Sequence, residues 1–239
     1  MSFGDSIGNL RAVSNELSVI NSNIVGANRI AYKKSDYSYG GGGARQINDQ
    51  TQIPDANLTT SNTSIDFGQG TIVNTGNPTD FAINGQGFFL LQQIQDVGIN
   101  QPNLLSRDGS FKFSNVPALG GNILTTNNGL VVLKDNGFGS YVPITRNDFD
   151  NNNFRPSVVN PNISEDSLKF SNKGSTVFEF DGTVSPADGL LVEGSLETSN
   201  SDLAGSIAAM SLNSKKFEAM AAQLKVEQNN LDTIIGLFK

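Results

Sequence analysis

The fold is decided by residues 203–238, which read LAGSIAAMSLNSKKFEAMAAQLKVEQNNLDTIIGLF. Apolar residues recur in this segment at intervals of seven, at Leu203, Met210, Phe217, Leu224, Leu231 and Phe238. A repeat of seven keeps one narrow apolar stripe along a helix, which is the pattern of a seam between helices. The sequence therefore predicts a C-terminal helix over 201–239, with Ser201 or Asp202 as the capping residue at its start.

The same repeat occurs near the N-terminus, where the residues seven apart are Phe3, Leu10, Leu17 and Ile24. A second apolar row follows three places behind, at Val13, Ile20 and Ala27. These rows predict one amphipathic helix within 1–35 that ends around 26–28. A single stripe is usually the core face of an ordinary helix. Because both ends carry one and the middle does not, we expect the two helices to pair as a coiled coil and to pack against neighbouring subunits.

Between these ends the apolar period changes to two, which is typical of β-strands. Residues 79–92 are predicted as a hairpin that turns at Asn84-Gly85, and Asp108-Gly109 is predicted to turn a second hairpin between 104–105 and 111–113. A third hairpin is expected over 167–184, where Asp181-Gly182 closes a strand. The fold class is therefore α+β, with an extended arm over 36–79, a central antiparallel β domain over 80–185 and a return linker over 186–200.

Two segments show no periodicity. Residues 39–58 contain four consecutive glycines at 40–43 and a proline at 54, which predicts an extended arm or a mobile loop. Residues 147–162 are rich in Asn and Pro, which predicts an exposed loop.

Composition excludes several classes of function. The formal net charge of −7 argues against nucleic-acid binding, which needs a positive face. The chain has no Cys and no His, so it offers neither a thiol nucleophile nor the commonest general base and metal ligand. No run of apolar residues is long enough for a membrane helix, so we expect no membrane insertion. The N-terminal residues lack the pattern of a secretory signal, so if the protein is exported we expect a route without a cleaved signal peptide.

The sequence contains no complete motif for catalysis, cofactor binding or metal binding. The spacing of Asp148, Asp150 and Asn152 matches the start of a calcium loop, but Asn153 replaces the glycine and Val159 the bidentate carboxylate. The glycines at 40–43 are not followed by the residues of a phosphate loop. No lysine has a serine three places before it, which removes the Ser-x-x-Lys arrangement. We therefore expect a protein that is not an enzyme, without cofactors or metals.

Three segments occur in an order known from one protein family. Residues 17–24, LSVINSNI, lead to Tyr32-Lys33; residues 80–89, DFAINGQGFF, precede 106–111, SRDGSF; and residues 196–200, LETSN, open the C-terminal helix. Together they resemble the flagellar axial family, which comprises the rod, hook and hook-associated proteins of bacteria. Ala31 stands where the family has glycine. The residues that carry the motifs are Asn23, Asp80, Asn84, Gly85, Gly87, Phe88, Phe89, Arg107, Asp108, Gly109, Ser199 and Asn200.

The resemblance implies that the terminal helices form an inner coiled-coil tube, that the adjoining linker locks neighbouring subunits and that the β domain faces outward. It implies a helical homopolymer that transmits torque and encloses the export channel. The implied partners are further copies of the chain, other rod and hook proteins and the flagellar type III export apparatus, and the implied location is the periplasm-spanning rod of the basal body. Length favours a larger rod protein, and the opening Met1-Ser2-Phe3 keeps a hook subunit as the alternative. A secreted β-domain adhesin with a helical stalk is a further alternative, and a hydrolase is the third.

Overall fold

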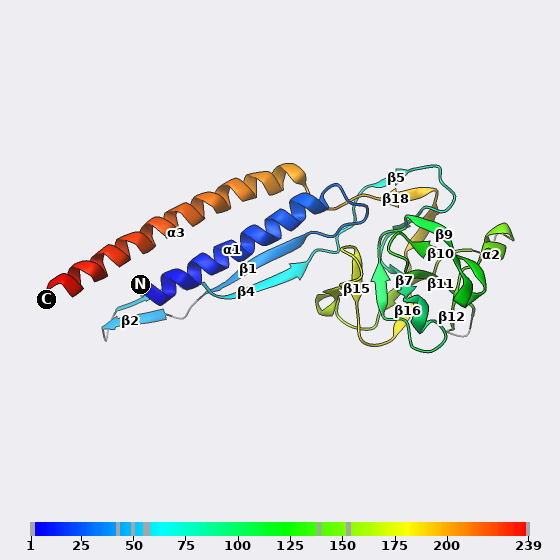
Figure 1. Ribbon diagram of the computed structural model, residues 1–239, viewed down its shortest axis with the longest axis horizontal. Coiled ribbons are helices and arrows are strands. Elements are labelled where there is room, and N and C mark those ends of the chain that lie inside the picture. The colour runs from blue at the N-terminus through cyan, green and yellow to red at the C-terminus, as the bar shows by residue number, and fades with distance from the viewer. Residues whose placement is uncertain are drawn as a thin grey trace. The chain divides into compact units, whose positions relative to one another are not determined.

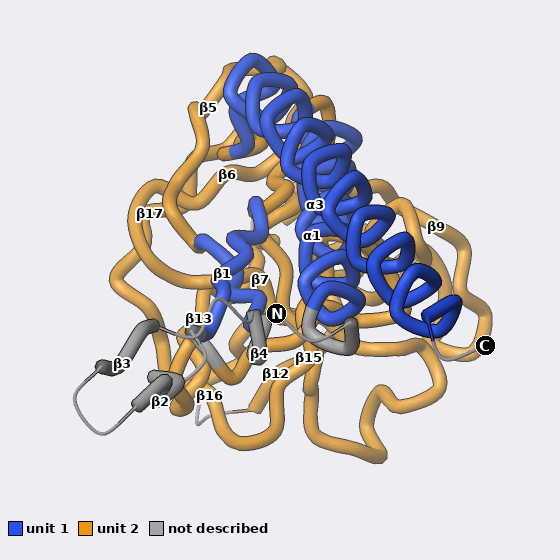
Figure 2. Tube along the Cα trace, turned by 90° about the vertical axis from the view of Figure 1, so that its left-hand side faces the viewer, with its two compact units in different colours: residues 1–27, 34–66, 201–239 blue, residues 28–33, 67–200 orange. Residues whose placement is uncertain are grey.

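The computed structural model describes residues 3–41, 44–48, 51–54, 58–137, 140–151 and 154–237. The side chains of residues 3–5, 41, 44–48, 51–54, 58–61 and 166 lie outside this description. The chain divides into two compact units, which are described separately (Figure 2). Unit 1 comprises residues 1–27, 34–66 and 201–239, and unit 2 comprises residues 28–33 and 67–200.

Unit 1 consists of two long helices and a pair of β-ribbons. Its elements are α1 (Phe3–Gly26), β1 (Ser35–Gly41), β2 (Ala44–Asn48), β3 (Thr51–Pro54), β4 (Leu58–Ile65) and α3 (Leu203–Leu237). Strand β1 pairs with β4 and β2 pairs with β3, both antiparallel. Helix α1 lies between α3 and the β1–β4 ribbon (Figure 1).

Both terminal helices are confirmed close to their predicted bounds. Helix α1 ends at Gly26, and α3 begins directly after Asp202. The two carboxylate oxygens of Asp202 accept hydrogen bonds from the backbone N–H groups of Ala204, at 3.1 Å, and Gly205, at 2.9 Å. These first-turn donors have no partner within a helix, so Asp202 is the residue that caps α3.

Residues 39–58 are predicted as an extended arm or a mobile loop, and their described residues form extended, paired strands. In β1, Tyr37 and Tyr39 are half-buried while Asp36 and Ser38 are exposed, which is the alternation of a strand with one covered face. In the sequence of β1 this alternation is carried by the two tyrosines alone, and its other residues are glycines and small polar residues. The alternation is therefore too weak to identify a strand from the sequence.

The regular structure of unit 2 consists mostly of short strands. They are β5 (Ile72–Asn74), β6 (Phe81–Asn84), β7 (Phe88–Gln92), β8 (Leu104–Ser106), β9 (Phe111–Val116), β10 (Gly121–Thr126), β11 (Val131–Asp135), β12 (Tyr141–Pro143), β13 (Val158–Pro161), β14 (Lys169–Phe170), β15 (Val177–Glu179), β16 (Val184–Pro186), β17 (Leu190–Glu193) and β18 (Ser195–Glu197). One helix, α2 (Arg146–Asp150), and three 3-10 turns, η1 (Ile94–Asp96), η2 (Pro117–Leu119) and η3 (Glu165–Ser167), complete it.

In the described residues, the main sheet of unit 2 has ten strands, seven of which form a path in the order β14-β15-β8-β7-β11-β10-β9. Strand β12 pairs with β11, β13 with β7 and β16 with β13, while β17 with β6 and β18 with β5 form two small separate sheets. Every described pair is antiparallel, which confirms the predicted antiparallel β body.

The core of unit 2 forms around β7, whose five residues are all buried. Phe88 and Phe89 point to opposite faces of this strand, as successive strand residues do. The ring of Phe88 meets Phe67 edge-on with centroids 5.4 Å apart, and the ring of Phe89 meets Phe111 edge-on at 5.1 Å. Both aromatics belong to the core, with Phe88 1% and Phe89 0% exposed.

Two of the three predicted hairpins are wrong, although their turns exist. Strand β6 pairs with β17 rather than with β7, and β8 pairs with β7 and β15 rather than with β9. Gly85 and Gly87 have φ angles of +107° and +121°, so they turn the chain, but they carry it from one sheet into another. Gly109 serves a different need, because a Cβ there would lie 1.7 Å from the carbonyl oxygen of Phe81.

The third hairpin is confirmed for its first two strands, since β14 pairs with β15. Gly182, with a φ of +138°, then directs the chain away, and β16 pairs with β13.

The exposed loop predicted over 147–162 is also wrong, and the linker predicted over 186–200 contains regular structure. The first range contains most of α2 and all of β13, and the second contains β17 and β18. Helix α2 begins with a capping box, in which Thr145 Oγ1 accepts from the Asp148 N–H and Asp148 Oδ2 accepts from the Thr145 N–H. Asn152 and Asn153 lie outside the described residues.

Candidate assembly surface and buried ion cluster

The face of α1 that is covered in unit 1 has a seven-residue repeat of mixed polarity. One row consists of Ser6, Val13 and Ile20, and the other of Asn9, Glu16 and Asn23. The predicted seam of α1 lies beside this face, since Leu10, Leu17 and Ile24 are half-exposed. The second predicted row is the buried one, with Val13 fully covered and Ile20 8% exposed. The side chain of Phe3 lies outside the described residues.

The predicted seam of α3 is not the row that packs on α1. Four of its residues are exposed by about two-fifths, namely Leu203 by 40%, Met210 by 39%, Phe217 by 42% and Leu231 by 45%. Leu224 is half-buried, and Phe238 lies outside the described residues. The covered row is instead Ser206, Asn213, Met220 and Glu227, also seven apart, and among these Asn213 is 1% exposed.

Helix α3 exposes apolar side chains on more than one side. Ile207 and Ile235 extend the seam at 53% and 57% exposure, and Leu212 and Val226 lie on the opposite side at 60% and 57%. The polar face is narrow and includes an exposed ion pair between Lys215 and Glu218. A helix that is apolar on several sides is normally buried on several sides. The exposed apolar surface of α3 therefore marks it as a candidate interface.

A polar cluster joins α1, α3 and β1. The Glu16 carboxylate accepts hydrogen bonds from the Tyr39 hydroxyl and from the Asn213 side-chain amide. Lys216 Nζ lies 3.5 Å from the same carboxylate and 5.8 Å from the centroid of the Tyr39 ring. Burial raises the pKa of Tyr39, and the hydrogen bond to Glu16 raises it further, so the hydroxyl stays protonated and donates.

A second cluster is buried in unit 2 and consists of two cations around one carboxylate. Lys33 Nζ lies 2.7 Å from Glu197 Oε1, and the side chains of both residues are 0% exposed. Arg107 Nη1 lies 3.5 Å from Glu197 Oε2. Backbone groups complete the coordination, since Lys33 Nζ donates to the Gly68 carbonyl at 2.8 Å and the Gly70 N–H donates to Glu197 Oε1 at 2.8 Å.

Arg107 is anchored twice more in unit 2. Its Nη2 donates to the Gly85 carbonyl at 2.8 Å, and its guanidinium lies 5.3 Å from the centroid of the Phe88 ring. Burial lowers the pKa of Arg107, and the negative charge of Glu197 opposes that shift. Arg107 thereby ties the turn after β6 to the ion cluster.

The three charged residues of this cluster come from the three segments that carry the family resemblance. Sequence reasoning named Arg107 and missed Lys33 and Glu197, because lysine and glutamate are exposed by default. The residues just before Lys33, Ala31 and Tyr32, are buried as well. Ala31 has a φ of +52°, a region that favours glycine, and this is the position where the family has glycine.

The remaining motif residues hold turns and chain ends in place. Asn23 pairs with the backbone of Ser35 in both directions, donating through Nδ2 at 2.8 Å and accepting through Oδ1 at 2.9 Å. Asn200 donates through its backbone N–H to the Tyr32 carbonyl at 3.2 Å and through Nδ2 to the Gly68 carbonyl at 3.0 Å. Ser199 is half-exposed, and Asn84 is the exposed last residue of β6.

The two motif aspartates close turns within unit 2. Asp80 accepts hydrogen bonds from Thr75 Oγ1 at 2.7 Å and from Asn77 Nδ2 at 3.0 Å. Asp108 Oδ1 accepts from both the N–H and the hydroxyl of Ser110, at 3.0 and 2.6 Å. Burial raises the pKa of Asp108 despite these hydrogen bonds. Both carboxylates are thus engaged by local partners.

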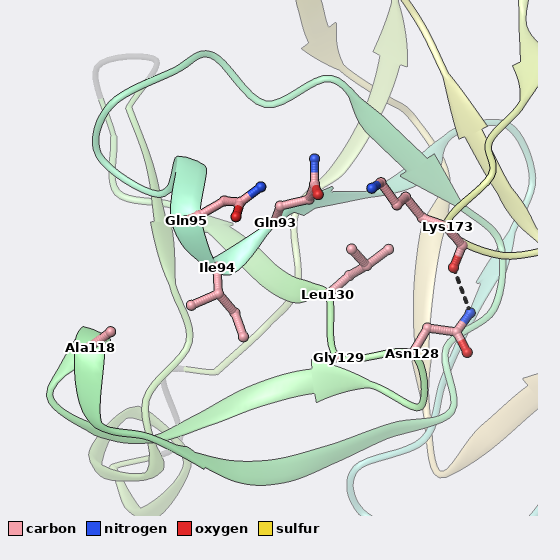
Figure 3. Close-up of a pocket in the computed structure, with 8 residues that line it drawn as sticks. All are labelled: Gln93, Ile94, Gln95, Ala118, Asn128, Gly129, Leu130 and Lys173. Atoms are coloured by element: carbon pink, nitrogen blue, oxygen red, sulfur yellow. Dashed lines mark hydrogen bonds between the residues drawn. The ribbon is translucent and has the colours of Figure 1, made fainter.

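A pocket on unit 2 has a volume of about 450 Å³ (Figure 3). Lys173 is the single charged residue among the eight that line it, and its carbonyl accepts a hydrogen bond from Asn128 Nδ2 at 3.1 Å. The other lining residues are Gln93, Ile94, Gln95, Ala118, Gly129 and Leu130. Amides, one ammonium group and three apolar side chains offer binding contacts, but no nucleophile paired with a base.

Within the described part of the chain, no group of three or more potential metal-ligating residues comes together. In the same residues, no helix is long and apolar enough to cross a membrane. A scan against protein-family models and a search of curated proteins each found no match to this chain.

Proposed function

We propose that this chain is an axial structural subunit of the bacterial flagellum, most similar to a larger rod protein, which polymerises into a helical tube through its terminal helices. The observation that carries this proposal is the exposed apolar surface of α3, which repeats every seven residues along the helix. An unpartnered seam of this length needs another helix to cover it. Identical subunits related by a repeated rotation and rise would cover it with heterologous contacts and form an open tube.

Covering the exposed apolar surface of α3 would contribute free energy to assembly. Complete burial of a large apolar side chain stabilises by about 1.5 to 3 kcal/mol. Met210 and Phe217 retain about two-fifths of their exposure, so covering the remainder contributes roughly 0.6 to 1.2 kcal/mol for each such side chain. The exposed apolar residues of α3 together would contribute several kcal/mol per subunit before the costs of association.

The connections between the helices and the β domain support a mechanical role. The segment after α1 and the segment before α3 are held together in unit 2, since the Ala31 N–H donates to the Glu197 carbonyl at 2.8 Å. The side chains of Lys33 and Glu197 reinforce the same junction. A subunit that transmits torque needs its entering and leaving strands fixed to one another, and this arrangement provides that.

The experiment compares two charge insertions on α3. Phe217→Asp places a carboxylate in the exposed seam, and Ser211→Asp places the same charge on the polar face near Lys215 and Glu218. The purified chain is concentrated, and its assembly is followed by analytical ultracentrifugation and negative-stain electron microscopy. We expect the wild-type chain and Ser211→Asp to form elongated polymers and Phe217→Asp to remain monomeric. Polymerisation of Phe217→Asp at the wild-type concentration contradicts the proposal.

A flagellar hook subunit is the alternative within the same family, because a hook protein would use the same helices. The second candidate from another class is a secreted β-domain adhesin, and the pocket beside Lys173 is the observation that favours it. A glycan that raises the melting temperature of the full chain, but not that of a Lys173→Ala variant, would support the adhesin.

A further inference from the structure

The pairing of α1 with α3 raises a question of register. The covered residues of α1 and of α3 both repeat every seven residues. Sliding one helix past the other by seven residues, about 10 Å, would therefore restore a similar meeting of surfaces. On the α1 side, Val13 and Ile20 are both aliphatic and do not distinguish one such position from the next. Ser201 Oγ donates to the Asn23 carbonyl at 3.0 Å and ties the start of α3 to the end of α1, so a further polar contact along the helices is what would hold the observed register over their length.

Glu16 has the chemistry to do so. Its side chain is 18% exposed, so its carboxylate is largely removed from water. A carboxylate in that position needs donors and an opposite charge, and α3 supplies both through Asn213 and Lys216. We propose that Glu16 is a positioning residue that fixes the register in which α1 and α3 pair.

The alternatives available on α3 are poorer for Glu16. A shift of seven residues in one direction brings Met220 to the place of Asn213, and Gln223 to the place of Lys216. That shift removes the positive charge and puts a thioether against the carboxylate. A shift in the other direction brings Ser206 and Ala209, which keeps one hydroxyl and no charge. Only the observed register gives the carboxylate an amide donor and a cation together.

Strand β1 completes the selection. The two hydrogen bonds between Asn23 and the Ser35 backbone fix the start of β1 to the end of α1. Tyr39 on β1 then presents its hydroxyl to Glu16 from the α1 side. Glu16 and Tyr39 therefore form one fixed half of the contact, and Asn213 with Lys216 forms the half that would slide. A second polar contact, from Ser6 Oγ to Glu227 Oε2 at 2.8 Å, agrees with the same register.

A polar residue in a helical seam is a known means of selecting one register at some cost in stability. The inference goes beyond the proposed flagellar role, because it concerns the pairing of two helices of one chain and holds for any function of the exposed surface.

The test measures the register directly by pulsed electron spin resonance. The chain contains no cysteine, so Ser14→Cys on α1 and Asn229→Cys on α3 provide two unique labelling sites on exposed residues. These positions are offset along the helix axes, so a slip of seven residues changes their separation by about 10 Å. Spectra are taken on dilute chain mixed with an excess of unlabelled chain, which removes distances between copies.

We expect the doubly labelled chain to give one narrow distance distribution. Glu16→Leu, which keeps the bulk and removes the carboxylate, is expected to add a second distance about 10 Å away. Glu16→Gln, which keeps an oxygen acceptor for Tyr39 and Asn213, is expected to restore a predominantly single distance. An unchanged single distance in Glu16→Leu overturns the proposal. Loss of any defined distance together with the helical circular dichroism signal also overturns it, because Glu16 would then hold the helices together and not select their register.

Discussion

Replacing Lys33 by methionine tests whether the buried ion cluster holds unit 2 together. Methionine keeps most of the length of the side chain and removes the ammonium group. Glu197 is then left 0% exposed, with Arg107 3.5 Å away and the Gly70 N–H as its remaining contacts. Breaking a buried ion pair by removing one partner costs about 3 to 5 kcal/mol. Because Arg107 still compensates part of the charge, we expect a loss near the lower end, about 3 kcal/mol.

The assay must follow unit 2 separately, because a chain of two units need not unfold in one transition. Native-state hydrogen exchange of the β7 amides, followed by mass spectrometry of a peptide that contains residues 88–92, reports on the centre of its core. A loss of about 3 kcal/mol lowers the protection of these amides by a factor of roughly 150. The control is Lys173→Met, which removes an exposed lysine from the same unit and is expected to change stability by less than about 0.5 kcal/mol.

A double variant separates the ion pair from general disruption. Lys33→Met combined with Glu197→Leu removes the stranded carboxylate along with its partner, so its cost is expected to be smaller than the sum of the two single costs. Two results would contradict this account of the cluster. One is equal protection of the β7 amides from exchange in Lys33→Met and Lys173→Met. The other is a double variant whose loss of stability equals the sum of the losses in Lys33→Met and Glu197→Leu.

Substitutions at three further positions test individual features. Ala31→Val places a β-branched residue at a buried position with a φ of +52°, and we expect it to lower the free energy of unfolding by about 3 kcal/mol in thermal unfolding. Ala31→Gly is expected to stay within about 1 kcal/mol of wild type. Equal losses in the two variants would contradict the argument from the backbone angle. Gly109→Ala forces a Cβ to within 1.7 Å of the Phe81 carbonyl oxygen, and we expect it to lower the free energy of unfolding in urea by about 3 kcal/mol or more. A near-neutral result would show that the backbone of β6 does not approach Gly109 so closely. Burial alone would raise the pKa of Asp148, but hydrogen bonds from Lys134 and Thr145 outweigh it and lower that pKa, so the resulting stability is present above about pH 4 and is lost as the pH falls through the lowered pKa. The difference in melting temperature between wild type and Asp148→Asn should therefore shrink between about pH 4 and pH 2, and a constant difference would contradict this assignment.

The terminal helices were predictable because their signal is local and repeated. Seven-residue spacing over several turns identifies α1 and α3 without knowledge of their partners. The direction in which each stripe faces was not predictable, because it depends on Asn213, Glu16 and Tyr39 meeting across three elements. In the sequence, a polar residue on a helix face looks like an interruption of an apolar stripe. In unit 1, the polar residues Glu16 and Asn213 lie at the centre of the contact between α1 and α3.

Strand positions were predictable in unit 2, and strand partners were not. Asn84-Gly85 is a strong local sign of a hairpin, yet β6 takes its partner from residues 190–193, more than a hundred positions later. The turn after β6 contains Gly85 and Gly87 and leads the chain from one sheet into another. Nothing in the local sequence distinguishes such a turn from the turn of a tight hairpin. The ion cluster was hidden for the same reason, since Lys33 and Glu197 are brought together by the fold and by no local pattern.

The most direct test of the axial role is to locate the protein in the cell that makes it. Hook–basal bodies are purified from the source organism, their subunits are quantified by mass spectrometry, and an antibody raised against residues 67–200 is applied with gold labelling. The proposed function predicts that the chain copurifies in multiple copies and that the label lies along the rod axis. Absence of the chain from intact hook–basal bodies, with the protein recovered elsewhere in the same cells, would contradict it.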